Sequence, residues 1–254
     1  MRTIQEFAYP GKPVFGVWAT IADAGIVEMA KWAGFDFVRV DNEYIPFNYE
    51  KISEMIRTAN LFDIPILVRI SRMEDITSLI AFGVNGVVVP DCDNVERVKE
   101  AIRLVKYHPV GARGVNPGSR AVRMSGLAPA DYIKQANDCV SLSIQIENAN
   151  ALGHIDDILS LEGIDLVSSG RGDISQSLGM PGDTKHPGVI EVEDRIIKKT
   201  LEHGKIPSIL ALTREDLVGL VGKGVNVFTI ASDDTLLMNA MKRHVDDFRQ
   251  ALRP

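Results

Sequence analysis

The sequence is poor in cysteine and in long apolar runs. Its 254 residues include two cysteines, Cys92 and Cys139, which are far apart and form no metal-binding spacing. We therefore expect a reduced, cytoplasmic protein and no disulfide framework. No apolar run approaches the roughly 18 residues of a membrane span, and the N-terminus lacks the apolar core of a signal peptide. A membrane partner is not expected.

Basic residues are outnumbered and scattered. The chain carries 28 Lys and Arg against 34 Asp and Glu, for a formal net charge of -6. This balance argues against a nucleic-acid surface, although a local Arg pocket could still hold an anionic substrate. The hydrophobic content of 45% suffices for a sizeable core, and no Pro/Gly/Ser-rich linker divides the chain. We predict a single domain over residues 1–254.

Eight short apolar segments alternate with helical patterns. The predicted strands are Val14 to Ala19, Phe37 to Val40, Pro65 to Ile70, Gly86 to Pro90, Ser141 to Ile146, Asp165 to Ser169, Pro207 to Leu212 and Asn226 to Ile230. Near-continuous apolar strands suit a parallel sheet covered on both sides, and eight repeats over this length favour a closed (β/α)8 TIM barrel. A doubly wound open sheet is the alternative, but no glycine-rich dinucleotide turn follows the first strand.

Two segments depart from this alternation. The stretch from Lys106 to Pro129 is predicted to be a long loop, which in a compact domain is usually functional or an interface. The last segment, Asp233 to Leu252, carries an apolar stripe at helical spacing. We expect this helix either to close the barrel or to pack on another subunit.

Two acidic residues stand just beyond predicted strands, Glu147 and Asp173. The carboxyl ends of the strands in a barrel share one face, so both carboxylates are expected to reach the same site. Oxygen ligands without cysteine or histidine favour a Mg or Mn type of ion. The alternative is structural, with Glu147 capping the next helix and Asp173 forming a turn.

Other polar residues follow strands on the same face. Arg69 ends an apolar strand, and its charge needs an anionic ligand or an ion pair with Glu43 or Asp41. Gln145 shares a strand face with Glu147 and could contact a ligand or orient a carboxylate. The Gly170 to Gly172 turn could bring backbone amides close to a carboxylate or phosphate.

Several motifs in order resemble those of the HpcH/HpaI metal-dependent aldolases over nearly the whole chain. They are Val68-Arg69, Gly86 to Pro90, Gly111 to Gly114, Gln145 to Glu147, Gly170 to Ser175 and His186-Pro187. The resemblance implies a β/α barrel of the phosphoenolpyruvate/pyruvate-binding type, usually a hexamer with an exchanged C-terminal helix. It also implies cleavage of a 4-hydroxy-2-oxoacid to pyruvate and an aldehyde.

The same resemblance implies a role for each site residue. Glu147 and Asp173 would bind a divalent metal, Mg, Mn or Co. Arg69 would steady the enolate oxygen, Gln145 would contact substrate, and the amides around Gly172 and Asp173 would hold the pyruvate carboxylate. A homo-oligomer, trimer or hexamer, is the expected assembly.

Tyr44 is a departure from the family pattern. The family normally has Glu-His where this chain has Glu43-Tyr44, and the Asp that pairs with this His is also absent from Leu79 to Gly83. A phenol with a pKa near 10 is a poor base at pH 7 but can donate a proton or hydrogen bond. Ordinary retro-aldol cleavage therefore needs another base, and a metal-bound water is one alternative.

Three functions remain open from the sequence. The first is a metal-dependent carbon–carbon lyase of the aldolase type. The second is a 2-oxoacid decarboxylase, which forms the enolate without deprotonating a hydroxyl. The third is a non-catalytic metal- or oxoacid-binding relative. His186 is the histidine expected nearest the site, and Tyr44, Phe47 and Arg123 are candidates to shape the aldehyde side.

Overall fold

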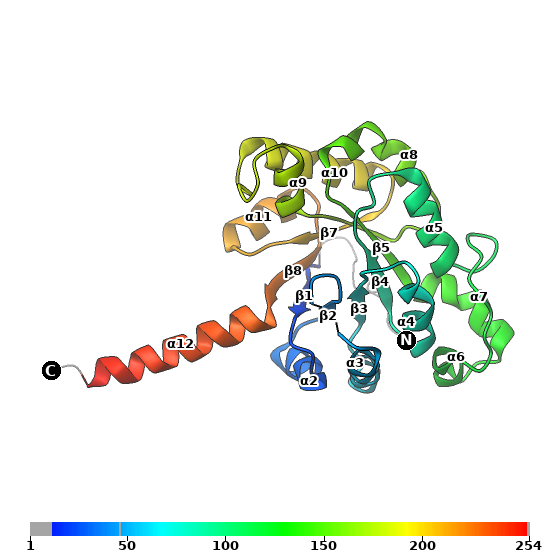
Figure 1. Ribbon diagram of the computed structural model, residues 1–254, viewed down its shortest axis with the longest axis horizontal. Coiled ribbons are helices and arrows are strands. Elements are labelled where there is room, and N and C mark those ends of the chain that lie inside the picture. The colour runs from blue at the N-terminus through cyan, green and yellow to red at the C-terminus, as the bar shows by residue number, and fades with distance from the viewer. Residues whose placement is uncertain (1–11, 46, 253–254) are drawn as a thin grey trace.

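The strands form one closed, all-parallel barrel. The computed structural model describes residues 12–45 and 47–252. Within them the strands pair in sequence order, and the last pairs with the first (Figure 1). They are β1 (Val14–Ala19), β2 (Phe37–Asp41), β3 (Ile66–Arg69), β4 (Gly86–Val89), β5 (Ser141–Ile146), β6 (Leu166–Ser169), β7 (Ile206–Leu210) and β8 (Val227–Ser232). The predicted (β/α)8 barrel is confirmed, and the open-sheet alternative is wrong.

Helices follow the strands and surround the barrel (Figure 1). They are α2 (Ala24–Ala33), α3 (Tyr49–Leu61), α4 (Asp75–Phe82), α5 (Val95–Val105), α6 (Arg120–Ser125), α7 (Pro129–Cys139), η1 (Ala149–Gly153), α8 (Ile155–Leu159), α9 (Arg171–Ser177), α10 (Pro187–Glu202), α11 (Arg214–Gly222) and α12 (Asp233–Ala251). Gly34 and Gly83 end α2 and α4 in the left-handed conformation, with φ of 90° and 97°.

The stretch predicted as a loop contains two ordered anchors. Helix α6 lies within it, begun by Ser119, whose hydroxyl accepts from the amide of Val122. Lys106 precedes α6, and its side chain is 2% exposed. Its ammonium donates to the carbonyls of Asn137 and Val140 and to the Asp165 carboxylate at 2.7 Å, so all three of its protons are used. The prediction of a structureless loop is therefore wrong in part.

The described residues form four apolar clusters. The largest lies between the sheet and its helices, and a smaller cluster fills the barrel itself. The smaller cluster comprises Val14, Phe37, Leu67, Val88, Leu166 and Val227. Gly16 makes room for it, since a Cβ there would lie 2.2 Å from Cζ of Phe37. This packing seals the N-terminal end of the barrel and leaves the C-terminal end for polar groups.

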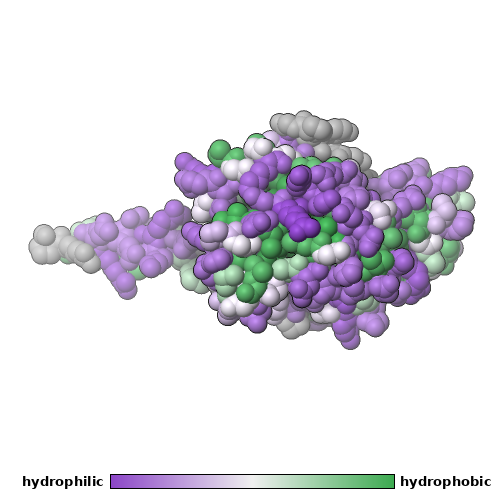
Figure 2. Space-filling model, turned by 90° about the horizontal axis from the view of Figure 1, so that it is seen from above, coloured by the Kyte–Doolittle hydropathy of each residue, from purple (hydrophilic) through white to green (hydrophobic). Residues whose placement is uncertain are grey.

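Helix α12 leaves the barrel instead of covering it. Its 19 residues extend from β8 as a projecting arm (Figure 1), which Figure 2 shows with hydrophilic residues prevailing along it. At its root the Asp233 carboxylate accepts from the amides of Thr20 and Ile21, which ties the arm to the end of β1. The helix therefore does not close its own barrel. Within the described residues, no helix is long and apolar enough to cross a membrane.

Arg39 places a charge inside the barrel. It is 3% exposed, and its guanidinium donates to the Ser208 hydroxyl at 3.0 Å. Its Nε has no partner in the described structure, and the same holds for the hydroxyl oxygens of Ser143 and Thr229. Burial, followed by the charge of Arg69, lowers the pKa of Arg39 to about 10. The guanidinium is thus charged at neutral pH but poorly compensated.

Replacing Arg39 by methionine is expected to raise the free energy of unfolding at pH 7. A base whose pKa is lowered by folding costs stability at every pH below the folded value, and the cost declines only as pH rises above about 10. Removing the charge should add about 1–3 kcal/mol, as replacement of buried ionic groups by apolar ones often does. Urea denaturation at pH 7 measures it, with the exposed Arg214→Met as the control. A loss of stability specific to Arg39→Met would contradict this expectation.

Candidate active site

Polar side chains gather where the strands end. Asp41 and Arg69 are the last residues of β2 and β3, Glu147 follows β5, and Asp173 lies in the first turn of α9, after β6. Because all strands are parallel, these positions share the C-terminal end of the barrel. The predicted convergence of these elements on one end is confirmed.

Arg69 is held by two carboxylates. Its Nε and Nη2 donate to the two oxygens of Asp41 at 3.1 and 2.9 Å, and its Nε lies 3.1 Å from Oε2 of Glu43. The Arg69 side chain is 8% exposed. The bidentate bond fixes the plane of the guanidinium as well as its position. The ion pair with Glu43 or Asp41 that the sequence left open therefore exists with both residues.

Two aromatic rings contact the same guanidinium. The Arg69 guanidinium carbon lies 4.6 Å from the ring centroid of Trp18 and 5.0 Å from that of Tyr44. Tyr44 is 66% exposed, so its hydroxyl is accessible to a ligand. The charge of Glu43 first, and then burial, raises the pKa of Tyr44 above its usual value. The phenol is therefore protonated at neutral pH and serves as a hydrogen-bond donor.

Glu147 is a buried carboxylate without a cationic partner in the described structure. It is 5% exposed, and it accepts from the Asp91 amide at 3.1 Å and from the Gln145 side chain. Burial, assisted by the charges of Asp173 and Glu43, raises its pKa to about 7. The next helical segment, η1, is capped by Asn148, so the alternative of Glu147 as a cap is wrong.

Backbone geometry supports the position of Glu147. Asp91 has a φ of 54°, an unusual value for a residue with a side chain, and its amide points at the Glu147 carboxylate. Gly170 packs against the other oxygen, since a Cβ there would lie 2.7 Å from Oε1. A larger residue at position 170 would displace the carboxylate. Gly172, in contrast, has open space around it.

A hollow of about 260 Å³ opens beside Glu147 and Asp173. Its other lining residues are Asp91, Asp93, Asn148, Gln176 and Ser177. In the described residues, no group of three or more His, Cys, Asp or Glu side chains has the geometry to hold a metal. Two carboxylates that line one hollow still suit Mg²⁺ or Mn²⁺, which are commonly bound through one or two carboxylates with water or ligand oxygens completing the shell.

Charge balance gives independent support for a cation. Negative side chains outnumber positive ones around Glu147. The carboxylates that act on it or on one another are those of Asp41, Glu43, Asp91 and Asp173. The guanidinium of Arg69 is in contact with two of them, Asp41 and Glu43. Burial is the main cause of the raised pKa of Glu147 and the neighbouring negative charges add to it, and a bound cation would oppose both effects. The donor set therefore fits a hard divalent ion.

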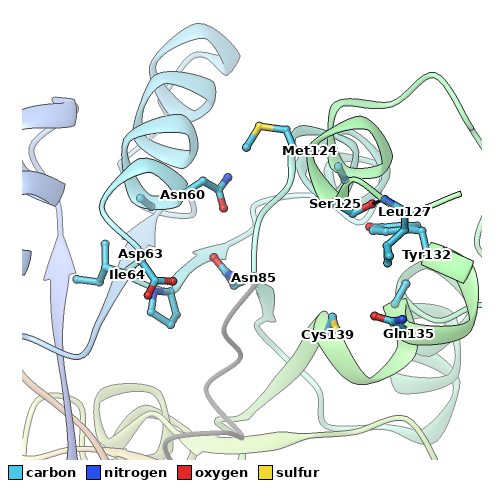
Figure 3. Close-up of a pocket in the computed structure, with 14 residues that line it drawn as sticks. Asn60, Asp63, Ile64, Asn85, Met124, Ser125, Leu127, Tyr132, Gln135 and Cys139 are labelled. Carbon is cyan, nitrogen blue, oxygen red and sulfur yellow. Dashed lines mark hydrogen bonds between the residues drawn. The ribbon is translucent and has the colours of Figure 1, made fainter. Parts of the chain in front are cut away.

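A larger hollow, of about 370 Å³, lies at the opposite end of the barrel. It sits between the end of α3, the residues before β3 and β4, and helices α6 and α7 (Figure 3). Asp63 is the one charged residue among its described lining residues. This hollow touches the chain just before β3 and β4 begin, whereas Arg69 and Glu147 stand where β3 and β5 end. The hollow is therefore far from both residues. Size alone does not identify the active site here.

Several residues singled out in the sequence do not line the hollow beside Glu147. Arg171 is bound to Glu193, with a 2.8 Å bond from its Nε, so its role is structural. His186 begins α10, with Nδ1 accepting from the Gly188 amide. Phe47 is part of the apolar core. Arg123 lies on α6, next to residues that line the larger hollow at the far end.

Trp18 and Asp91 were missed in the sequence. The period of two in β1, which places Trp18 on the face of Gly16, could have identified the first. Asp91 follows β4 as Asp173 follows β6, so its position after a strand was the available signal.

Similarity to known proteins covers nearly the whole chain. The family model described as HpcH/HpaI aldolase/citrate lyase matches residues 14–240. The chain is 30% identical over 233 residues to a 4-hydroxy-2-oxo-heptane-1,7-dioate aldolase of Escherichia coli, covering 91% of this chain and 88% of that protein. It is 29% identical over 253 residues to a hydroxypyruvate/pyruvate aldolase of Roseobacter denitrificans, covering 98% of each.

A solved structure agrees over the full length. The HpcH/HpaI aldolase from Desulfitobacterium hafniense superposes with a TM-score of 0.92 at 26% identity, covering 100% of this chain and 98% of that one. The fold, the match to the family model and the activities of the relatives all indicate a lyase of the aldolase type. The chain belongs to the HpcH/HpaI aldolase/citrate lyase family.

Proposed function

We propose that the protein is a divalent-metal-dependent aldolase that cleaves or forms a 4-hydroxy-2-oxoacid through the enolate of pyruvate. The observation that carries the proposal is Glu147, a buried carboxylate with a raised pKa beside Asp173, at the same end of the barrel as the fixed guanidinium of Arg69. This arrangement combines a place for a cation with a permanent positive charge. Negative charge that develops on an oxoacid oxygen between them would be stabilised.

Glu147 and Asp173 would hold Mg²⁺, Mn²⁺ or Co²⁺. When bound, the cation would supply Lewis-acid polarisation of the oxoacid. Gln145 donates a hydrogen bond from its amide nitrogen to Glu147. The amide oxygen of Gln145, Oε1, is buried and has no partner in the described structure, so it would be available to substrate. Gln145 therefore serves as a substrate contact and orients the carboxylate.

The remaining groups would orient the oxoacid. Arg69 donates toward the enolate oxygen, and Asp41 keeps the guanidinium from turning away. The backbone amides of Gly172 and Asp173, in the first turn of α9, would bind the pyruvate carboxylate. The open space around Gly172 supports a close approach of substrate to this backbone.

Tyr44 would act from the solvent side of Arg69. Its ring packs on the guanidinium, and its pKa is raised, so its hydroxyl donates a hydrogen bond at neutral pH. We assign it the role of donor to the substrate oxygen at the bond that breaks. Tyr44 stands where the family normally has histidine, and its ring does not supply a base.

Glu147→Gln is expected to weaken metal binding and cleavage together. The amide keeps the shape but loses the charge, so affinity for Mn²⁺ should fall about 10–100-fold or more, as with other disturbed metal sites. Titration calorimetry measures the binding. Pyruvate release from 4-hydroxy-2-oxoacids, with and without chelator, measures the reaction.

The exposed Glu162→Gln is the matched control and should leave both measurements unchanged. Chelator-insensitive cleavage by the wild type would contradict the metal role. Release of pyruvate from oxaloacetate but from no hydroxy-oxoacid would contradict the aldolase assignment and indicate a decarboxylase.

A homo-oligomer, trimer or hexamer, is part of the proposal. Helix α12 leaves its own barrel but exposes an apolar stripe, and a second copy of the chain is the partner that would cover it, with the helix exchanged between subunits. The stripe comprises Leu236, Leu237, Met238, Met241, Val245 and Phe248, each 45% exposed or more. Apolar surface of this kind marks protein–protein contact.

Phe248→Asp combined with Val245→Asp should dissociate this assembly. Two charges on the stripe would have to be buried without partners, which is costly. Light scattering after size exclusion measures the mass, with Gln250→Asp on the same helix as the control. A wild type that is monomeric at micromolar concentration would contradict the assignment.

A cytoplasmic location is proposed with small-molecule partners and neither nucleic acid nor membrane. Cys92 is a fully buried thiol, and burial raises its pKa to about 12, so it is inert. A reduced compartment suits such a cysteine.

A further inference from the structure

Retro-aldol cleavage needs a base that the proposed roles do not supply. The proton leaves the C4 hydroxyl, the C3–C4 bond breaks, the electron pair forms the enolate at C2 and C3, and C4 becomes an aldehyde. Tyr44 is protonated and cannot accept this proton at neutral pH. The structure must therefore provide another acceptor close to Arg69, where the oxoacid would be held.

Histidine does not fill this role in the described part of the chain. His186 caps α10 through Nδ1, His203 pairs with Asp156 at 2.9 Å, and His244 stacks on Phe248. His108 and His154 are exposed, and neither lines the hollow beside Glu147. Apart from a metal-bound water, the acceptors that the described residues offer are carboxylates.

Several carboxylates at the C-terminal end of the barrel already have a partner or an assigned role. Both oxygens of Asp41 accept from Arg69, and its Oδ1 also accepts from the amide of Glu43 at 3.0 Å. Glu147 and Asp173 are assigned to the cation. Three carboxylates remain, Glu43, Asp91 and Asp93. Asp91 is exposed to solvent, and Oδ1 of Asp93 accepts from the side chain of Asn94, the next residue, at 3.1 Å.

Glu43 is paired with Arg69 but keeps a buried oxygen without a hydrogen bond. Oε2 lies 3.1 Å from Nε of Arg69, and this oxygen has no hydrogen-bond partner in the described structure. The side chain is 18% exposed, so solvent competes weakly but can exchange a proton. Its neighbour in sequence, Tyr44, packs on the same guanidinium. Glu43 thus borders the place where Arg69 would meet the substrate.

We propose that Glu43 is the general base that takes the C4 hydroxyl proton in the cleavage reaction, and the general acid that returns it in the condensation. The inference rests on the proposed aldolase function. After cleavage, Glu43 releases its proton to solvent and C3 of the enolate takes a proton from water, which yields pyruvate. Protons and electrons balance without any further reactant.

The surroundings of Glu43 favour this role. Burial raises the pKa of Glu43, and the charges of Asp91, Asp41 and Asp173 act in the same direction, whereas Arg69 opposes them. A carboxylate with a raised pKa is a stronger base, and general bases work best when their pKa lies near the working pH. The ion pair between Arg69 and Oε2 of Glu43 holds the group in place.

Glu43→Gln separates this role from a structural one. The amide oxygen can still accept from Arg69, so binding of oxalate with Mg²⁺, measured by calorimetry, should stay within about threefold. The rate constant kcat for hydroxy-oxoacid cleavage should fall about 10²–10⁴-fold, the usual contribution of a general base. Decarboxylation of oxaloacetate, which removes no hydroxyl proton, should change by less than about threefold because it bypasses the base.

The pH dependence supplies a second readout. At saturating metal, wild-type kcat/KM should decline as pH falls through the pKa of Glu43, and this acid limb should be absent from the residual activity of Glu43→Gln. Glu43→Asp should retain part of the activity, and the exposed Glu50→Gln should retain all of it.

Three results would overturn the inference. Equal losses of cleavage and decarboxylation in Glu43→Gln would show a role in holding Arg69 only. Unchanged cleavage in Glu43→Gln, or the full loss in Asp91→Asn instead, would exclude Glu43 as the base. Wild type that cleaves no hydroxy-oxoacid would overturn the proposed function, and this inference with it.

Discussion

The bidentate bond between Arg69 and Asp41 is the interaction on which the site depends. A guanidinium that is 8% exposed needs compensation, and Asp41 supplies it with a fixed orientation from the neighbouring strand. The rings of Trp18 and Tyr44 and the carboxylate of Glu43 are arranged around this pair. Because β2 and β3 are in register at these two residues, the barrel itself sets the direction of the positive charge.

The distribution of charge separates two kinds of buried ion. Lys106 uses all its donors on protein oxygens, as a structural cation should. Glu147, in contrast, keeps a raised pKa because it is buried and its neighbours are acidic, and this is the pattern of a group that awaits a cation. Arg39, which lies inside the barrel, has fewer partners for its charge than Lys106, because its Nε makes no hydrogen bond in the described structure. Stability is therefore lower than an apolar barrel interior would allow.

The sequence predicted the barrel well because apolar runs bounded by polar residues mark parallel strands directly. The limits of Val14–Ala19 and Ser141–Ile146 were reproduced in full. Side-chain partners were harder, since pairs such as Arg171 with Glu193 join residues of different elements. Helix α6 was missed because its six residues carry too little periodicity. The exact direction of Arg39 depends on strand tilt and packing, which a strand pattern alone does not give.

The central claim is that Arg69 and a bound cation together stabilise the enolate of pyruvate. Exchange of the pyruvate methyl protons for deuterium, followed by NMR with Mg²⁺ or with chelator, tests it without any aldehyde. The account predicts metal-dependent exchange by the wild type, slowed about 10²–10³-fold in Arg69→Lys, which keeps the charge but loses the bidentate bond to Asp41. Absence of exchange by wild type saturated with pyruvate and Mg²⁺ would contradict the account.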